Sequence, residues 1–201
     1  MKRAVFTAVV MALLLAPGLA AAQESKAPEM DSAMAAMWAE WAKYANPVAE
    51  HKLMEKQVGQ WTYVSRMWMD PNAPATESKG TCEVTPLLGG RFFRTDYHGN
   101  MMGEPFEGIA IVGYDIAKKM YTGVWMDNFG TMMMTYSGTC NADGSECVYK
   151  ATLDDPVMKV TKNVREVCRW TGPDTWVLEW YESWPGQEER KGMEITHTRV
   201  K

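Results

Sequence analysis

The chain has 201 residues, of which 46% are hydrophobic and 23% charged, and its formal net charge is −4. This length suits a single domain with a full hydrophobic core. The mildly acidic balance argues against non-specific binding to nucleic acid or to anionic membranes, because both surfaces repel an acidic protein.

The N-terminus has the three parts of a secretory signal peptide. A basic head at Met1–Arg3 precedes an apolar stretch over residues 4–16, and small residues follow up to Ala22. The apolar stretch is shorter than the roughly 20 residues that a membrane-spanning helix needs. We therefore expect a signal peptide at 1–22 and an exported bacterial protein, periplasmic or secreted, with no stable membrane insertion after cleavage.

Two helices are expected next. Polar residues 23–30 predict a flexible leader, and Asp31 is a candidate N-cap. Methionine and aromatic residues then recur at helical spacing: Met34, Met37, Trp38, Trp41 and Tyr44. We expect this stripe on the protein's own core or rim, with a partner-binding or membrane-binding surface as the alternative. Asn46 and Pro47 indicate the N-cap and first position of a second helix that ends near Gln57.

Beyond Gln57 the hydrophobic pattern changes to a period of two, which predicts β-strands. Turn-rich segments separate ten candidate strands: Gln60–Met69, Glu77–Thr85, Arg91–His98, Glu107–Tyr114, Met120–Asp127, Met132–Thr139, Glu146–Thr152, Val160–Trp170, Thr175–Ser183 and Glu189–Thr198. Short connections without a helical crossover predict antiparallel neighbours in chain order. A sheet of this size removes its edges by closing on itself. We predict a mainly β protein, with an up-and-down antiparallel β-barrel of about ten strands at residues 58–201. The helical segment at 31–57 should cover one mouth.

The alternation does not identify the face that points inward. Along Thr175–Ser183, for example, both faces combine large apolar side chains with a carboxylate, Glu182 on one and Glu179 on the other.

Four cysteines lie beyond residue 22, and an even count in an exported chain favours disulfides. Cys140 and Cys147 flank a turn-rich segment and should lie near the ends of one hairpin. The favoured pairing joins Cys140 to Cys147 and Cys82 to Cys168, while the other two connectivities stay open. The spacing lacks the Cys-x-x-Cys pattern of redox and zinc sites.

The residues predict no cofactor. His51, His98 and His197 are the only histidines, and nothing in their spacing requires that they converge. Haem bound through one of them, and Cu(I) bound by the methionines at 101–102 and 132–134, are the alternatives. Because consecutive strand residues point to opposite faces, a methionine triplet in a strand cannot present three sulfurs together.

Several motifs resemble those of the bacterial family known as domain of unknown function 1579. They are Leu88–Phe92, Gly103–Gly108, Val112–Asp115, Trp125–Thr131 and Lys191–Ile195. The likeness extends from about His51 to Arg199. It implies a calycin-like β-barrel of the lipocalin or nitrobindin type, in agreement with the strand pattern. The family has no established activity, so the resemblance assigns no catalytic residue.

The leading functional hypothesis is that the barrel binds a small apolar or amphipathic molecule. The candidate binding residues are Trp61, Arg91, Trp125, Asp127 and Tyr181. One alternative is a hydrolase or isomerase in which a buried carboxylate, Asp127 or Glu179, acts as general base. The other is a protein-interaction module that acts through the Met/Trp-rich helix.

Overall fold

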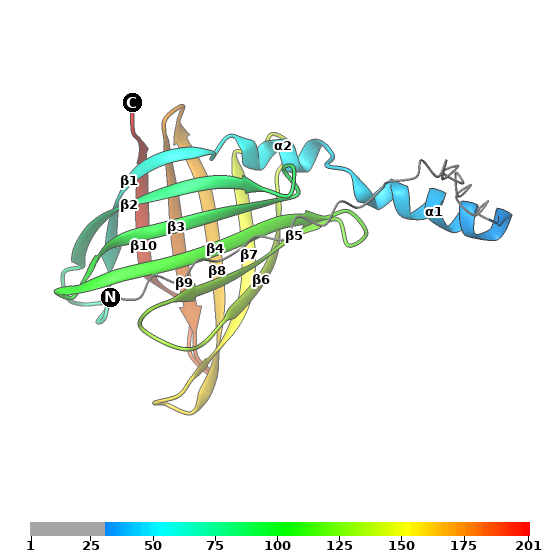
Figure 1. Cartoon of the computed structure of the whole chain (residues 1–201). Helices are drawn as coiled ribbons and strands as arrows, with labels where there is room; N and C mark the ends of the chain where they lie inside the picture. The colour runs from blue at the N-terminus through cyan, green and yellow to red at the C-terminus, as the bar shows by residue number, and fades with distance from the viewer. Residues whose placement is uncertain (1–30) are drawn as a thin grey trace, which may run out of the picture. The chain divides into compact units, whose positions relative to one another are not determined.

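The computed structural model describes residues 31–201, so the expected signal peptide at 1–22 and leader at 23–30 lie outside the described residues. Ten antiparallel strands follow one another around a closed barrel, and β1 pairs with β10 to complete it (Figure 1). The strands are β1 Gly59–Met67, β2 Thr76–Leu87, β3 Phe92–Met101, β4 Glu104–Asp115, β5 Met120–Asp127, β6 Met134–Cys140, β7 Glu146–Asp155, β8 Val160–Gly172, β9 Thr175–Ser183 and β10 Arg190–Arg199. The predicted fold class is confirmed.

Pairing and burial identify the inner face. On β1, Trp61, Tyr63 and Ser65 are buried, whereas the alternate residues face solvent. The register continues this layer around the wall, from Trp61 to Cys82 on β2 and then to Tyr97 on β3. Alternate residues therefore line the lumen on each strand, and the bulge between Lys191 and Met193 shifts this alternation by one residue on β10.

Glycines on β3 and β4 make room for two large rings in the lumen. A Cβ at Gly99 would lie 2.3 Å from Tyr63 Oη, and a Cβ at Gly108 would lie 2.4 Å from the Trp125 ring. Tyr63 and Trp125 thus fill the lumen on the β2–β4 side, where a larger residue in either wall position would expel them.

The first helix, α1 Ser32–Ala45, is capped as expected, because Asp31 Oδ1 accepts a hydrogen bond of 2.6 Å from the Ala33 N–H. No residue of α1 is buried, and the packing of its methionine and aromatic stripe stays a prediction. The chain divides into two compact units after Ala39, and most of α1 belongs to the first. Among the described residues, no helix has the length and apolar character needed to cross a membrane.

The second helix, α2 Ala49–Glu55, covers one mouth of the barrel. Its own residues His51 and Met54 are buried, and Tyr121 Oη on β5 donates a 3.0 Å hydrogen bond to the Glu50 carbonyl. The helix starts later than expected at Asn46 and Pro47. The reason is a local contact: the N–H of Val48 donates to His51 Nδ1 at 3.1 Å, so Val48 occupies the cap position.

One of the two expected disulfides is present. Cys140 and Cys147, paired across β6 and β7, form a disulfide. The expected bond between Cys82 and Cys168 is not formed, and both are free thiols. The two thiols belong to β2 and β8, which do not neighbour each other in the barrel, whereas Cys168 lies beside Cys147 in the register of β7 and β8.

Loss of the Cys140–Cys147 disulfide should lower the free energy of unfolding by about 2 kcal/mol. The bond closes a short loop with a sequence separation of 7, and loops of this size restrict the unfolded chain modestly. Urea unfolding of a Cys140→Ser/Cys147→Ser double variant measures the effect. Dithiothreitol should destabilise the wild type to the same extent and leave the double variant unchanged. A further loss in the double variant would reveal a second disulfide, contrary to this structure.

Candidate functional site

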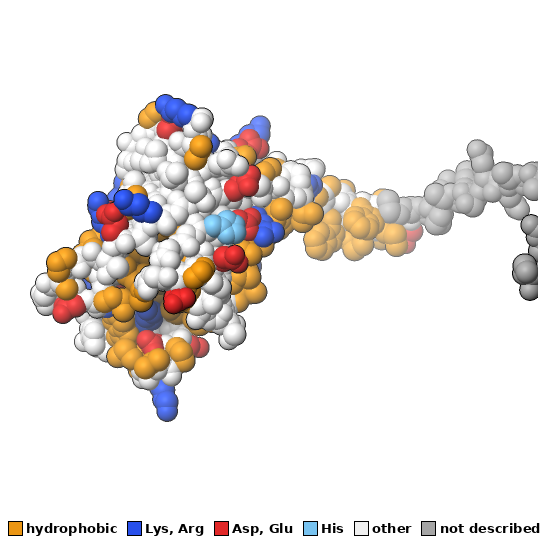
Figure 2. All heavy atoms as spheres, turned by 60° about the vertical axis from the view of Figure 1, so that its left-hand side comes forward, with side chains coloured by type: hydrophobic (Ala, Val, Ile, Leu, Met, Phe, Trp, Pro, Cys, Tyr) orange, Lys and Arg blue, Asp and Glu red, His pale blue; other side chains and the backbone are white. Residues whose placement is uncertain are grey.

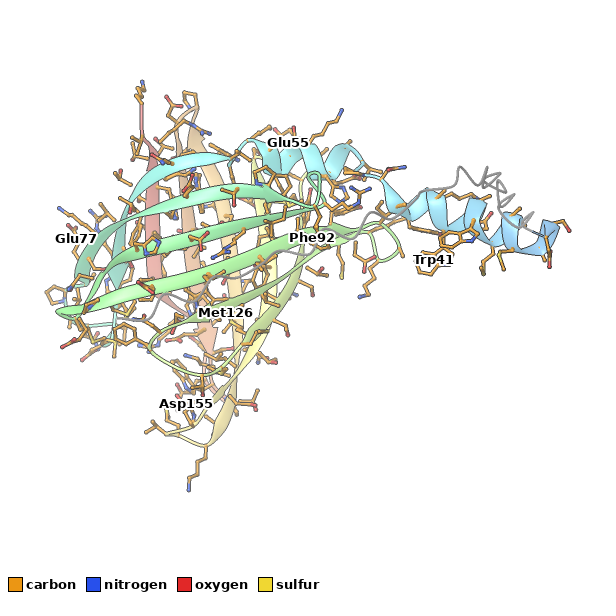
Figure 3. All side chains as sticks on the ribbon, viewed as in Figure 1. Trp41, Glu55, Glu77, Phe92, Met126 and Asp155 are labelled. Atoms are coloured by element: carbon orange, nitrogen blue, oxygen red, sulfur yellow. A yellow bond between two sulfur atoms is a disulfide. The ribbon has the colours of Figure 1, made fainter. Side chains whose placement is uncertain are left out.

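The two mouths of the barrel differ. One mouth lies under α2, where Glu55 is labelled, and the β7–β8 connection near Asp155 extends at the other (Figure 3). At the covered mouth, Trp61 is fully buried and packs against Trp170 and Trp176 at ring distances of 6.0 and 6.3 Å. Trp61 Nε1 donates to the Gln57 carbonyl at 2.8 Å, and the Arg199 guanidinium lies 4.1 Å from the ring. This cluster closes the mouth. It links the chain just after α2 to β1 through Trp61 and to β10 through Arg199.

A buried histidine lies directly below this cluster. The imidazole of His197 stacks on Trp176 at 3.5 Å, and its Nε2 lies 3.0 Å from Tyr97 Oη. Burial lowers the pKa of His197 to about 3, so the ring is neutral. Its Nδ1 is buried without a hydrogen-bond partner among the described residues. His197 is thus packed between the rings of Trp176 and Tyr97.

The lumen is filled unequally. On β1 to β3 the buried inner side chains are Trp61, Tyr63, Ser65, Cys82, Val84, Phe93 and Tyr97, and those of Met67, Ser78, Thr95 and Met101 are half-buried. A continuous series of aromatic contacts joins Tyr63 to Tyr97 and Tyr97 to Trp125 at ring distances of 5.5 Å. On β6 to β10, several inner side chains are only half-buried: Tyr136, Tyr149, Glu166, Cys168, Leu178, Trp180 and Ile195. These side chains are less completely buried than Trp61, Tyr63 and Phe93 on the opposite side of the barrel. The β6–β10 side of the lumen is therefore the less tightly filled one.

Glu166 on β8 is the most distinctive group in this space. It pairs with Tyr149 on β7 and with Trp180 on β9, so rings flank it on both sides. Burial alone raises the pKa of its carboxyl from 4.5 to about 7, and no charge or hydrogen bond among the described residues offsets this cost. Burial raises the pKa of Tyr136 and of Tyr149, and the Glu166 charge adds to the effect on Tyr136. The lumen thus offers an apolar, aromatic surface with one carboxyl group free to bind a ligand.

An ion cluster lies on the inner face near the uncovered mouth. Glu182 is buried and accepts hydrogen bonds from Lys162 Nζ at 2.7 Å and from Arg190 Nη2 at 3.1 Å. Lys162 and Arg190 also lie over the Trp184 ring, at 5.3 and 4.8 Å. Two cations and one carboxylate give this side of the entrance a positive balance, in contrast to the acidic chain as a whole.

The structure does not bring the five predicted binding residues together. Trp61 belongs to the sealed mouth, whereas Trp125 lies in the lumen and donates its Nε1–H to Asp127 Oδ2 at 2.9 Å, near the uncovered mouth. Asp127 also accepts the Phe129 N–H and shapes the β5–β6 connection. Arg91 precedes β3 and donates to the Ala45 carbonyl. Tyr181 lies on the outer wall under the Arg165 guanidinium, at 4.0 Å.

Glu179, the other carboxylate considered as a general base, is engaged in ion pairs. Glu179 lies on the outer wall and accepts hydrogen bonds from Lys191 Nζ at 2.6 Å and Arg169 Nη1 at 2.9 Å. Burial raises its pKa, but these bonds and charges outweigh burial, and the net pKa is lowered. Glu166, which sequence reasoning missed, is the carboxyl with the raised pKa. One feature of the sequence points to it: Glu166 lies two residues from Val164 and two from Cys168 on the same strand, and both of these also face inward.

Two larger cavities lie outside the lumen. A groove of about 980 Å³ runs across the outer wall of β4 to β8, between apolar Ile111 and Val124 and charged Lys150, Arg165 and Glu189. A second cavity, of about 600 Å³, has Arg91, Tyr114 and Trp41 in its lining. Both are open depressions. A small enclosed space of about 30 Å³ lies under α2 beside Cys140, Cys147 and Cys168.

The three histidines occupy separate places. His51 is a buried residue of α2, His98 is exposed on β3, and His197 is in the lumen. Within residues 31–201, no three histidine, cysteine or acidic side chains are grouped so as to hold a metal ion.

Comparison with known proteins agrees with the barrel. Residues 46–199 match the family described as "Protein of unknown function (DUF1579)", and the chain belongs to this family. No curated protein matches. Among solved structures, the chain resembles Rv2717c from M. tuberculosis, with 11% identity, a TM-score of 0.56, and coverage of 78% of this chain and 100% of that one. It also resembles the S-type phycobiliprotein lyase CPES from Guillardia theta, with 14% identity, a TM-score of 0.56, and coverage of 77% and 94%. At these identities the likeness shows the fold alone.

Proposed function

We propose that this member of the DUF1579 family is an exported binding protein that takes a small apolar or amphipathic molecule into its lumen. The observation that carries the proposal is the half-buried inner surface on β6 to β10, which surrounds the unpartnered carboxyl of Glu166. Aromatic and aliphatic side chains around a single polar group form the usual lining of a small-molecule site. The uncovered mouth gives the ligand a path to this surface.

The polar group restricts the ligand class. A neutral Glu166 donates or accepts a hydrogen bond, and an ionised Glu166 pairs with a cation. A ligand with an apolar body and a hydroxyl, amide or amine at one end therefore fits better than a ligand with a carboxylate. An amine would lower the pKa of Glu166, because an opposite charge favours the ionised form.

Export is supported by two features. Residues 1–22 have the pattern of a signal peptide, and the Cys140–Cys147 disulfide suits an oxidising compartment.

A substitution that fills the lumen should abolish binding. Ala151 lies on the inner face of β7, paired with Val164, and Thr152 is the exposed residue next to it. Ala151→Phe should weaken binding of the apolar fluorophore N-phenyl-1-naphthylamine at least ten-fold, about 1.4 kcal/mol, whereas Thr152→Phe should leave it unchanged. Fluorescence titration measures both dissociation constants.

The stability of Ala151→Phe provides the control. If the β6–β10 side has interior space, the added ring should be accommodated with a loss below about 1 kcal/mol. A solid core would instead lose about 1–3 kcal/mol from overpacking. A wild-type protein that binds no fluorophore and yields no co-purified molecule on solvent extraction would contradict the proposal.

A further inference from the structure

The uncovered mouth carries a ring of exposed apolar side chains. These residues, the apolar rim, lie on the β1–β2, β3–β4, β5–β6 and β7–β8 connections: Met69, Met102, Phe129, Met132, Met133, Val157 and Met158. Their exposed fractions run from 47% for Met132 to 87% for Val157. On the rest of the described barrel strands and connections, the exposed large hydrophobic residues are Leu88, Phe92 and Val200. Hydrophobic side chains gather visibly at this end of the barrel (Figure 2).

The loops hold these side chains outward. Asp155 Oδ1 accepts the N–H groups of Val157 and Met158 at 2.9 and 2.8 Å. Asp127 Oδ1 accepts the Phe129 N–H at 3.0 Å, and Asn100 Oδ1 accepts the Gly103 N–H next to Met102. Each polar side chain is bonded to its own loop, so the apolar residues occupy the tips.

The charges near the apolar rim identify the surface that it suits. On the rim connections and the neighbouring β9–β10 connection, the exposed charged residues are Asp70, Glu188, Glu189 and a single cation, Lys159. Lys162 and Arg190, inside the entrance, are paired with buried Glu182. An anionic surface would repel this balance, and a zwitterionic lipid surface would not. Separate protruding tips around an opening also match a fluid interface, into which each side chain inserts individually, better than the flat complementary face of a folded partner.

We propose that the apolar rim docks the barrel, mouth first, on a zwitterionic phospholipid surface. The driving force is insertion of the loop tips. The docking itself rests on the rim residues. That a ligand passes from the lipid directly into the lumen rests in addition on the proposed function.

Vesicle flotation tests the docking with the chain that signal-peptide removal leaves, from Gln23 onward. The rim variant is Phe129→Asn/Met133→Gln/Met158→Gln, and the matched control is Leu88→Asn/Val200→Thr, which removes exposed apolar residues elsewhere. The wild type and the control should float with phosphatidylcholine vesicles, and the rim variant should bind at least ten-fold more weakly, about 1.4 kcal/mol. Raising the salt from 0.05 to 0.5 M should change wild-type binding less than two-fold, because the contact is apolar.

Several results would overturn the docking. The wild type does not float, the rim variant floats like the wild type, or the wild type self-associates through the rim in solution without binding vesicles. A Trp38→Gln/Trp41→Gln variant tests whether the exposed stripe of α1 binds the vesicles instead of the rim. If vesicle binding is lost in this variant and kept in the rim variant, the result also counts against the rim. The fluorophore titration in vesicle-free solution tests the lumen separately, so failure of one proposal leaves the other measurable.

Discussion

Replacement of Trp61 by alanine should lower the free energy of unfolding by about 3–5 kcal/mol, the range for deletion of a large buried ring. Trp61 has no exposed surface and contacts Trp170 and Trp176. Its loss also removes the hydrogen bond to the Gln57 carbonyl and the contact with Arg199, so the end of α2 loses its anchor on the barrel. Urea unfolding followed by circular dichroism measures the change.

The matched control is Trp41→Ala. Trp41 is 64% exposed on α1, so its replacement should change stability by less than about 0.5 kcal/mol. Trp61→Phe should recover most of the loss, because the phenyl ring refills the space while the indole hydrogen bond stays broken. Equal losses in Trp61→Ala and Trp41→Ala would show that Trp61 does not seal the mouth as described.

The strand pattern made the barrel predictable. β5 and β9 have the predicted bounds because clear turn residues flank them at both ends. The prediction failed at the start of β6, where apolar Met132 and Met133 were assigned to the strand and belong instead to the connection. Asn128 explains the difference: its side chain accepts the Glu107 N–H and donates to the Pro105 carbonyl, which ties the connection to β4. The local alternation of polar and apolar residues does not reveal such contacts between distant segments.

The inner face could not be read from the sequence because it contains ionisable residues. Lys162, Glu166 and Glu182 all face inward, and Val148 and Val167 lie on the opposite face. The rule that apolar residues face the lumen and charged residues face solvent therefore fails on β7 to β9. The register, which requires the coordinates, assigns the faces without ambiguity.

The same limit applies to the binding residues. Trp125 and Asp127 are close in sequence and remain close in space, and both lie at the uncovered end of the lumen. Arg91 and Tyr181 have side chains suited to ligand binding, but the turn before β3 directs Arg91 to the Ala45 carbonyl, and the alternation along β9 places Tyr181 on the outer wall. The helical stripe of α1 was recognised by its spacing, but spacing predicts a helix and does not say whether anything covers it.

Glu166→Gln should stabilise the protein at alkaline pH and have little effect at acid pH. Burial raises the pKa of Glu166 from 4.5 to about 7, so between these values the folded protein holds a proton that the unfolded chain has lost. Stability should consequently fall as the pH rises through this window and stay level above it. The pKa difference corresponds to a loss of roughly 3 kcal/mol above pH 7. Glutamine carries no charge at any pH and removes this loss.

Urea unfolding at pH 5 and pH 8 measures the prediction. The wild type should lose stability between the two values relative to Glu166→Gln, and the gain of the variant at pH 8 should approach 3 kcal/mol, the full linkage value. Glu179→Gln is the matched control on the neighbouring strand, and the expected change in stability has the opposite sign. Its pKa is lowered by Lys191 and Arg169 against the effect of burial, so its replacement should destabilise the protein at both pH values. If Glu166→Gln is neutral at pH 8, bulk water reaches the carboxylate, and the lumen around it is open rather than enclosed.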